Sequence, residues 1–219
     1  MAVRNLCALC ASFGDGADID ELEVAAFAPA PFTLQTVGGT MGPGNVALSG
    51  GAFAKDVLPG YAAHTIPHLK DGIYGNANSW IGDSLASFAG ITFTSATTID
   101  RIAFGRDNTP FYADRSDGFY LVQYSVIPGA NETTPDTGWT NIGPLYIDAA
   151  DPDRALRHEY SFSAVAGATA VRIVTPGAGI GNGTAIDELE VYAAVPEPGG
   201  VALAFGGMLS LLARRRRRA

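Results

Sequence analysis

The chain predicts an all-β fold, an antiparallel β-sandwich of the jelly-roll kind, with a short apolar helix at its C-terminus. Apolar and polar residues alternate over short segments, and turn-forming residues separate these segments. No segment carries the 3.6-residue apolar stripe of a helix over three turns. The 27 glycines, 13 prolines and only two lysines among 219 residues favour tight turns over long solvated helices. Seven or eight short strands without crossover helices are typical of a sandwich.

The clearest strand is expected over residues 157–164, where an apolar or aromatic face including His158 and Tyr160 alternates with polar positions. A second strand is expected over 120–126, with Tyr120 and Val122 facing inward. The further expected strands lie at 91–94, 98–104, 140–147, around 171–173 and at 185–192. His158 is interpreted as a packing residue, and Trp80 and Trp139, each at a strand edge, as core or lid aromatics.

The C-terminal tail has the composition of a targeting segment. Its parts are Val195, Pro196, Glu197 and Pro198, then 15 uncharged residues, then Arg214, Arg215, Arg216, Arg217 and Arg218. The apolar stretch is shorter than the about 20 residues of a comfortable membrane span, and the arginines would stay on the cytoplasmic side. The tail resembles the PEP-CTERM sorting signal of bacteria, which implies a short transmembrane helix and cleavage near Pro-Glu-Pro by an exosortase-type protease. An ordinary anchor helix with stop-transfer arginines is the alternative.

The charge balance indicates which partners to expect. Without the five tail arginines, nine basic side chains face 22 acidic ones, a net charge of −13 instead of −8. Such a surface repels nucleic acid and anionic lipid, and suits divalent cations and neutral or cation-bridged polymers. We therefore expect no nucleic-acid partner.

A long-range repeat indicates the domain organisation. Residues 14–24 and 181–191 are identical at eight of eleven positions and lie 167 residues apart, which is the size of one domain. We expect residues 1–24 to be the last strands of a preceding domain whose body lies upstream of Met1. We then expect an Ala/Pro/Gly-rich linker at 25–43, the sandwich at 44–193 and the sorting signal at 194–219. A degenerate signal peptide is the alternative for the first residues. Cys7 and Cys10 lack a second cysteine pair and are interpreted as incidental.

Several segments resemble a discoidin, or coagulation factor type C, domain of the galactose-binding-like superfamily. They are residues 45–48, residues 69–72 followed by Asn76, Asn78, Ser79 and Trp80, the strand 99–104 and the closing segment 187–192. The resemblance covers most of residues 44–192. It implies a jelly-roll sandwich, often with a structural calcium on one side and a ligand surface made by loops at one end.

A calcium site can also be argued from ligand chemistry. Calcium takes six to eight oxygen ligands from carboxylates, amides and backbone carbonyls. Asp71 and Glu188 are the expected pair, followed by Asn76 and Ser79. Alternatively, Asp71 and Asn76 are turn formers and Glu188 is a solvated strand residue.

The implied ligand surface would use aromatic rings for stacking and polar groups for hydroxyls. The expected residues are His64, His68 and Tyr74 in the first loops, with Tyr61, and Arg106, Asp107, Asn108 and Tyr112 after the central strand, with Arg115. Arg106 has an alternative role as a loop staple paired to Asp107 or Asp114.

Motifs of catalysis are missing from the sequence: it has no Gly-x-Ser-x-Gly, no HExxH and no phosphate loop. We therefore expect an exported, surface-sorted bacterial protein that passes from the inner membrane to the cell surface or extracellular matrix. Its non-catalytic module would bind extracellular polysaccharide or envelope glycan. The alternatives are a structural or adhesion protein with a calcium-stiffened sandwich and no sugar pocket, and the targeting module of a larger enzyme.

Overall fold

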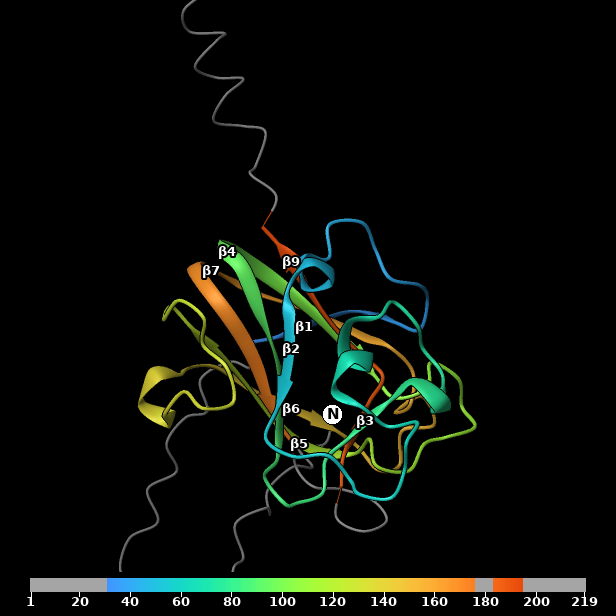
Figure 1. The fold of residues 1–219 in the computed structure, drawn as a ribbon. Coiled ribbons are helices and arrows are strands. Elements are labelled where there is room, and N and C mark those ends of the chain that lie inside the picture. Colours follow the sequence, from blue (N-terminus) through green and yellow to red (C-terminus); the bar gives the residue numbers. More distant parts are fainter. Residues whose placement is uncertain (1–30, 176–182, 195–219) are drawn as a thin grey trace, which may run out of the picture.

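The computed structural model describes residues 31–175 and 183–194, which form two packed antiparallel β-layers (Figure 1). The first layer contains, in spatial order, β2 (Gly51–Ala54), the start of β4 (Phe88–Gly105), the end of β7 (His158–Val174), β5 (Gly118–Ser125) and β6 (Thr140–Ile147). The second contains β1 (Thr33–Val37), the start of β7, the end of β4 and β9 (Glu188–Ala193). A small separate sheet pairs β3 (Trp80–Ile81) with β8 (Ala185–Ile186). The short 3-10 helices of this part of the chain are η1 (Val46–Ser49), η2 (Ile66–Lys70), η3 (Asn76–Asn78) and η4 (Asp136–Gly138).

The strands β4 and β7 run through both layers and join them. Their pairing register shifts between Thr92 and Arg101, where the sequence analysis placed a break between two strands. Extra residues in a ladder bend and twist a strand without ending it. The two expected segments are therefore the two arms of one bent strand.

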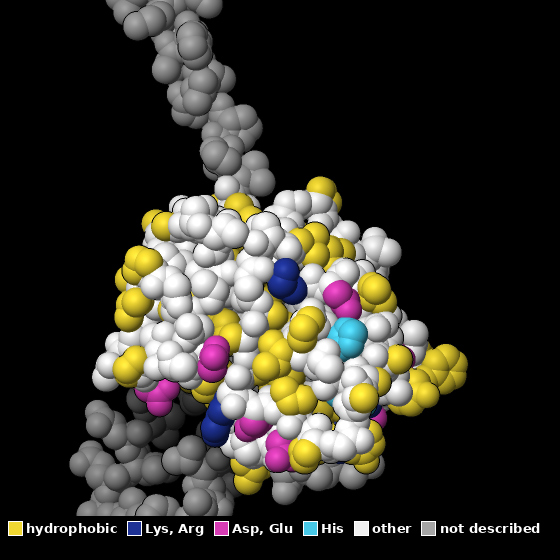
Figure 2. All heavy atoms as spheres, in the orientation of Figure 1, with side chains coloured by type: hydrophobic (Ala, Val, Ile, Leu, Met, Phe, Trp, Pro, Cys, Tyr) yellow, Lys and Arg dark blue, Asp and Glu magenta, His cyan; other side chains and the backbone are white. Residues whose placement is uncertain are grey.

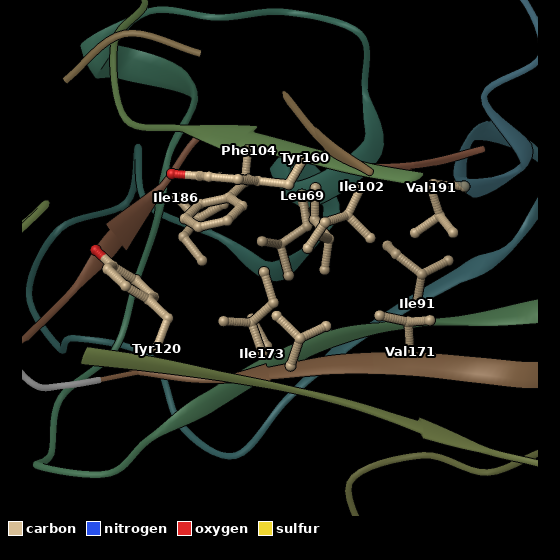
Figure 3. Packing of buried hydrophobic residues seen from close by; sticks show 14 of the residues in the cluster. Leu69, Ile91, Ile102, Phe104, Tyr120, Tyr160, Val171, Ile173, Ile186 and Val191 are labelled. Atoms are coloured by element: carbon tan, nitrogen blue, oxygen red, sulfur yellow. The ribbon is translucent and has the colours of Figure 1, made fainter. Parts of the chain in front are cut away.

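The core lies between the layers, as the alternation of apolar residues predicts (Figure 3). Ile102 and Val191 point inward from one layer and meet Ile91 and Ile173 from the other, and all four are fully buried. Burying each such side chain contributes roughly 1.5–3 kcal/mol. His158 is buried and stacks on Tyr160 with ring centroids 6.1 Å apart, which confirms its packing role.

A second, smaller apolar cluster covers the opposite face of the first layer. It contains Phe53, Ala130, Trp139 and Ala170, with Phe88 packed against them. The guanidinium of Arg172 lies 4.7 Å from the Phe88 ring centroid and 4.5 Å from that of Trp139. The segment 126–139, which follows β5, therefore closes over the outside of the sheet with Trp139 as its lid. Trp80, in contrast, is fully buried in the main core.

The structure differs from expectation at the N-terminal edge of the domain. Part of the expected linker at 25–43 forms β1, which pairs with β7, and Phe32 packs in the core. The expected strands at 1–24 lie outside the described residues, as does nearly all of the expected sorting signal from 195 onward, its transmembrane helix included. Within the ranges 31–175 and 183–194, no helix has the length and apolar character needed to cross a membrane.

Candidate functional site

The acidic start of the closing strand is entirely buried and holds a distant loop. Asp187, Glu188 and Glu190 are each 0% exposed. Their carboxylates accept hydrogen bonds from residues 71–79, which we call the clamped loop. The contacts are Gly72 N–H and Ile73 N–H to Glu188 Oε1 at 2.5 and 3.1 Å, Gly75 N–H to Asp187 Oδ2 at 2.6 Å, and the Tyr74 hydroxyl to Glu190 Oε1 at 2.6 Å. Tyr74 was expected to face a ligand, but its hydroxyl is hydrogen-bonded to Glu190 inside the domain.

Glu190 also belongs to a buried ion-pair network. Arg157 Nε lies 2.7 Å from Glu190 Oε1, and its Nη2 lies 2.8 Å from Glu190 Oε2 and 2.6 Å from Glu159 Oε2. Burial acts to lower the pKa of Arg157, but the hydrogen bonds to Glu190 and Glu159 outweigh it and raise that pKa. Burial acts to raise the pKa of Glu159, yet Arg157 and Arg101 hold it below its usual value. The network keeps these groups charged and ties β7 to β9.

The expected calcium residues fit a cation only in part. Burial, and then the neighbouring Asp71 carboxyl, raise the pKa of Glu188 to about 8, so the two carboxyls lie close together. Glu188 Oε2 is buried and has no hydrogen-bond partner among the described residues. A hard cation here would take the free Glu188 Oε2 and would share Asp71 with His68, whose Nδ1 lies 2.6 Å from Asp71 Oδ2. Burial also raises the pKa of neighbouring Asp187 to about 7.

The other two expected ligands are engaged elsewhere. Asn76 Oδ1 accepts a hydrogen bond from Arg106 at 3.1 Å, so this amide faces a positive charge. Ser79 Oγ donates to the Asn76 carbonyl at 3.2 Å. Across the part of the chain that the structure describes, no three His, Cys, Asp or Glu side chains are grouped to hold a metal. A calcium ion would therefore rely on Asp71, Glu188 and backbone carbonyls.

Arg106 is buried and links the loop 106–117 to the clamped loop. Only 4% exposed, it places Nη1 3.1 Å from Asp114 Oδ2 and also donates to the Asp114 carbonyl, while Nη2 reaches Asn76. The alternative role is thus confirmed for the pairing with Asp114. Because the side chain is buried, it shapes the loop 106–117 from within and offers little surface to a ligand.

The two polar residues after Arg106 also serve the fold. Asp107 accepts the Asn76 N–H at 2.8 Å and the Thr109 hydroxyl. Asn108 donates to the Gly39 carbonyl at 2.7 Å and accepts the Arg157 N–H at 3.1 Å. The density of hydrogen-bonding groups that suggested a ligand surface is therefore largely used to fix the loop.

Exposed aromatic side chains remain on the same loops. Tyr61 is 60% exposed, Phe111 84% and Tyr112 45%. The Tyr61 ring centroid lies 5.9 Å from that of His64. The sequence analysis did not name Phe111, although it is adjacent to Tyr112 in the same polar loop. Figure 1 places the segment between β2 and β3 and the loop after β4 on the same side of the sandwich.

The two predicted histidines have different surroundings. His64 lies near Arg106; burial, then that positive charge, lower the pKa of His64 and favour the neutral ring. Its Nδ1 is buried with no hydrogen-bond partner in the described ranges. His68 Nδ1 lies 2.6 Å from Asp71 Oδ2, so this ring faces the acidic pair. On the face shown in Figure 2, charged side chains are scattered and form no continuous basic patch.

The fold is shared with solved carbohydrate-binding modules. CpGH89CBM32-5 from Clostridium perfringens, solved with GalNAc-β-1,3-galactose, is 15% identical with a TM-score of 0.53, covering 68% of this chain and 99% of its own. Chitosan-binding module 2 of a chitosanase/glucanase from Paenibacillus sp. IK-5, solved with chitotriose, is 21% identical with a TM-score of 0.52, covering 68% and 100%. The family 32 module of C. perfringens NanJ, solved with galactose, is 16% identical with a TM-score of 0.51, covering 68% and 97%.

At these identities the likeness shows the fold alone, and it confirms the predicted antiparallel β-sandwich. No protein-family model matches the sequence, and no curated protein matches it.

Proposed function

We propose that the sandwich is a non-catalytic module that binds an extracellular glycan through the loops 55–65 and 106–117. The observation that carries the proposal is the set of exposed rings Tyr61, Phe111 and Tyr112; the loop of Phe111 and Tyr112 is fixed by the buried side chain of Arg106. Ring faces stack on the apolar faces of sugars, and a few polar groups set the orientation. The ligands of the three similar modules, all sugars, support this class of ligand without specifying which sugar this chain takes.

Binding here would depend on loops that are already ordered before the ligand arrives. A sugar that meets fixed rings loses less free energy to loop ordering than one that must organise them. Neutral His64 lies beside Tyr61, and because its Nδ1 is buried, only Nε2 would be able to meet a sugar hydroxyl. The module requires no bond-breaking chemistry for this role.

We also propose a structural calcium ion held by Asp71 and Glu188. When bound, it would supply positive charge to the exposed Asp71 and buried Glu188 carboxylates, whose proximity otherwise favours protonation of Glu188. The same carboxylate pair favours a second candidate function, a cation-stiffened spacer or adhesion unit without a sugar site. The acidic composition suits both roles.

The tail supports a proposal about location. We propose that residues 194–219 direct the protein out of the cytoplasm, anchor it in the inner membrane and present it to an exosortase-type protease before it reaches the surface or matrix. The order Pro-Glu-Pro, apolar stretch and arginine cluster supports this proposal. Attachment to a larger enzyme as its targeting module is compatible with the same binding role.

The test is calorimetric titration of the full chain with galactose, GalNAc-β-1,3-galactose and chitotriose, preceded by a glycan array. We expect Tyr61→Ala, Phe111→Ala and Tyr112→Ala each to weaken binding by roughly tenfold, because an aromatic contact contributes about 0.5–1.5 kcal/mol or more. The matched control is Phe119→Ala, since Phe119 is 56% exposed but lies on β5. Failure to bind any glycan on the array, or release of reducing sugar from the bound one, contradicts the proposal.

A further inference from the structure

Asn76 connects the clamped loop to the loop that displays the exposed aromatics. Its backbone N–H donates to Asp107 Oδ1 at 2.8 Å, and its side-chain Oδ1 accepts from Arg106 Nη2 at 3.1 Å. The clamped loop in turn is held by the buried carboxylates of Asp187 and Glu188. Asn76 therefore belongs to a loop that is anchored to the interior, and its side-chain oxygen holds the guanidinium of Arg106.

Arg106 passes this constraint to the aromatic loop. Its Nη1 bonds both the carboxylate and the backbone carbonyl of Asp114, two residues beyond Tyr112. Its Nε has no hydrogen-bond partner within the described part of the chain, so the guanidinium is oriented from its two Nη groups alone. Without the Asn76 acceptor, Arg106 Nη2 would be buried and would lack this hydrogen bond. The loss would be costly because hydrogen bonds to charged groups are among the stronger ones.

We infer that Asn76 is a positioning residue for the glycan site: it fixes Arg106, and Arg106 fixes the loop that carries Phe111 and Tyr112. Asn76 itself touches no ligand. This inference rests on the proposed function for its binding consequence, but the ordering of the loop is a property of the chain without ligand. It also separates Asn76 from Asp71 and Glu188, with which the sequence grouped it as a cation ligand.

Asn78 provides a matched control. It lies two residues away in the same 3-10 helix, it is likewise half-buried, and its side chain makes no hydrogen bond within the ranges 31–175 and 183–194. Asn76→Asp keeps an acceptor for Arg106 and is the conservative rescue variant. Asn76→Gln keeps the amide but displaces its oxygen by one methylene, and it replaces Asn76→Ala if that variant does not fold.

The experiment measures chymotrypsin cleavage after Phe111 and Tyr112 in the full chain, without ligand. We expect Asn76→Ala to increase that rate about tenfold or more, because losing a charge-assisted hydrogen bond raises the population of the open loop. Asn76→Asp and Asn78→Ala should be cleaved at the wild-type rate. Wild-type cleavage of Asn76→Ala, or equal acceleration in Asn78→Ala, overturns the inference.

A binding arm separates the inference from the proposed function. The same variants are titrated with the best of galactose, GalNAc-β-1,3-galactose and chitotriose. We expect about tenfold weaker binding by Asn76→Ala, and rescue by Asn76→Asp. If the wild-type chain binds none of the three sugars, the proposed function loses support, while the cleavage rates alone still decide the role of Asn76.

Discussion

Arg157 is a residue whose loss should strongly destabilise the domain. It is 2% exposed and paired with Glu190, which is fully buried. We predict that Arg157→Met lowers the free energy of unfolding by about 3–5 kcal/mol, because it leaves a buried carboxylate without its counter-charge. Urea unfolding followed by tryptophan fluorescence measures this change.

Arg101 is the control for that prediction. It pairs with Glu159 at 2.8 Å, but about a third of its side chain, 34%, is exposed. Solvent screens such a pair, so Arg101→Ala should cost no more than about 1 kcal/mol. Equal losses in the two variants would show that burial of the Arg157 network is not what makes it important.

The raised pKa values of Glu188 and Asp187 predict that the stability of the domain falls as the pH rises. Burial first, with Asp71 adding to it for Glu188, raises their pKa values to about 8 and about 7 in the folded chain. The folded state therefore holds protons that the unfolded state releases near pH 4, and these groups reduce stability progressively as the pH rises from about 4 to about 8.

The variant Glu188→Gln tests this dependence, since glutamine mimics the protonated acid. In the presence of a chelator, we expect the free energy of unfolding of the wild-type chain to fall between pH 5 and pH 8 by more than that of the variant. The difference should be on the order of a few kcal/mol. Calcium added at pH 8 should restore stability to the wild type and less to Glu188→Gln. Parallel pH profiles would contradict the predicted shift.

At the scale of elements, the segment 126–139 is a lid over the outer face of the first layer. Trp139 packs on Phe53 with ring centroids 5.9 Å apart and covers the guanidinium of Arg172. We predict that Trp139→Ala destabilises the domain by about 3 kcal/mol, as large-to-small changes in packed clusters do. Asp136→Ala removes the exposed partner of Arg172, 91% accessible, and should cost less than about 1 kcal/mol. Thermal unfolding of both variants compares the two contributions.

Alternation in the sequence was enough to locate strands with one buried face. The expected strand at 140–147 coincides with β6, and the segment 157–164 starts one residue before β7. The strand β1 was missed because all five of its residues are exposed, so no buried face marks it, and only pairing with β7 defines it. An edge strand of this kind is specified by its partner more than by its own pattern.

The candidate site was predictable only where residue type and family resemblance agreed. Asp71 and Glu188 were expected together and lie together. Tyr74 was expected at the surface, yet its hydroxyl bonds Glu190, 116 residues further along the chain. No local pattern encodes such a contact, because it depends on where the closing strand crosses the clamped loop.

At the scale of the whole domain, the last strand, β9, holds the second layer and the clamped loop together. The pairing of β9 with β4 completes the second layer, and Asp187 and Glu188, at the entry to β9, hold the clamped loop. Stability, cation binding and ligand binding should therefore be linked, since all three depend on these carboxylates. Ligand that binds the folded state alone must raise the melting temperature, and calcium should increase that effect.

The five arginines of the C-terminal tail lead to a prediction about membrane orientation. If the arginines set the orientation of the apolar stretch, replacing Arg214 to Arg218 by asparagine should leave the sandwich domain retained in the cytoplasm or inserted in mixed orientation. The matched control replaces the same five residues by lysine, which preserves the charge. Protease accessibility of the domain in spheroplasts, in a bacterium that carries an exosortase-type protease, measures orientation, and mass spectrometry of the mature C-terminus locates cleavage. Export and processing of the asparagine variant at the wild-type level would refute the role of the arginines. Loss of export in both the asparagine and the lysine variant would show that a receptor recognises the guanidinium groups themselves and that charge alone does not direct sorting.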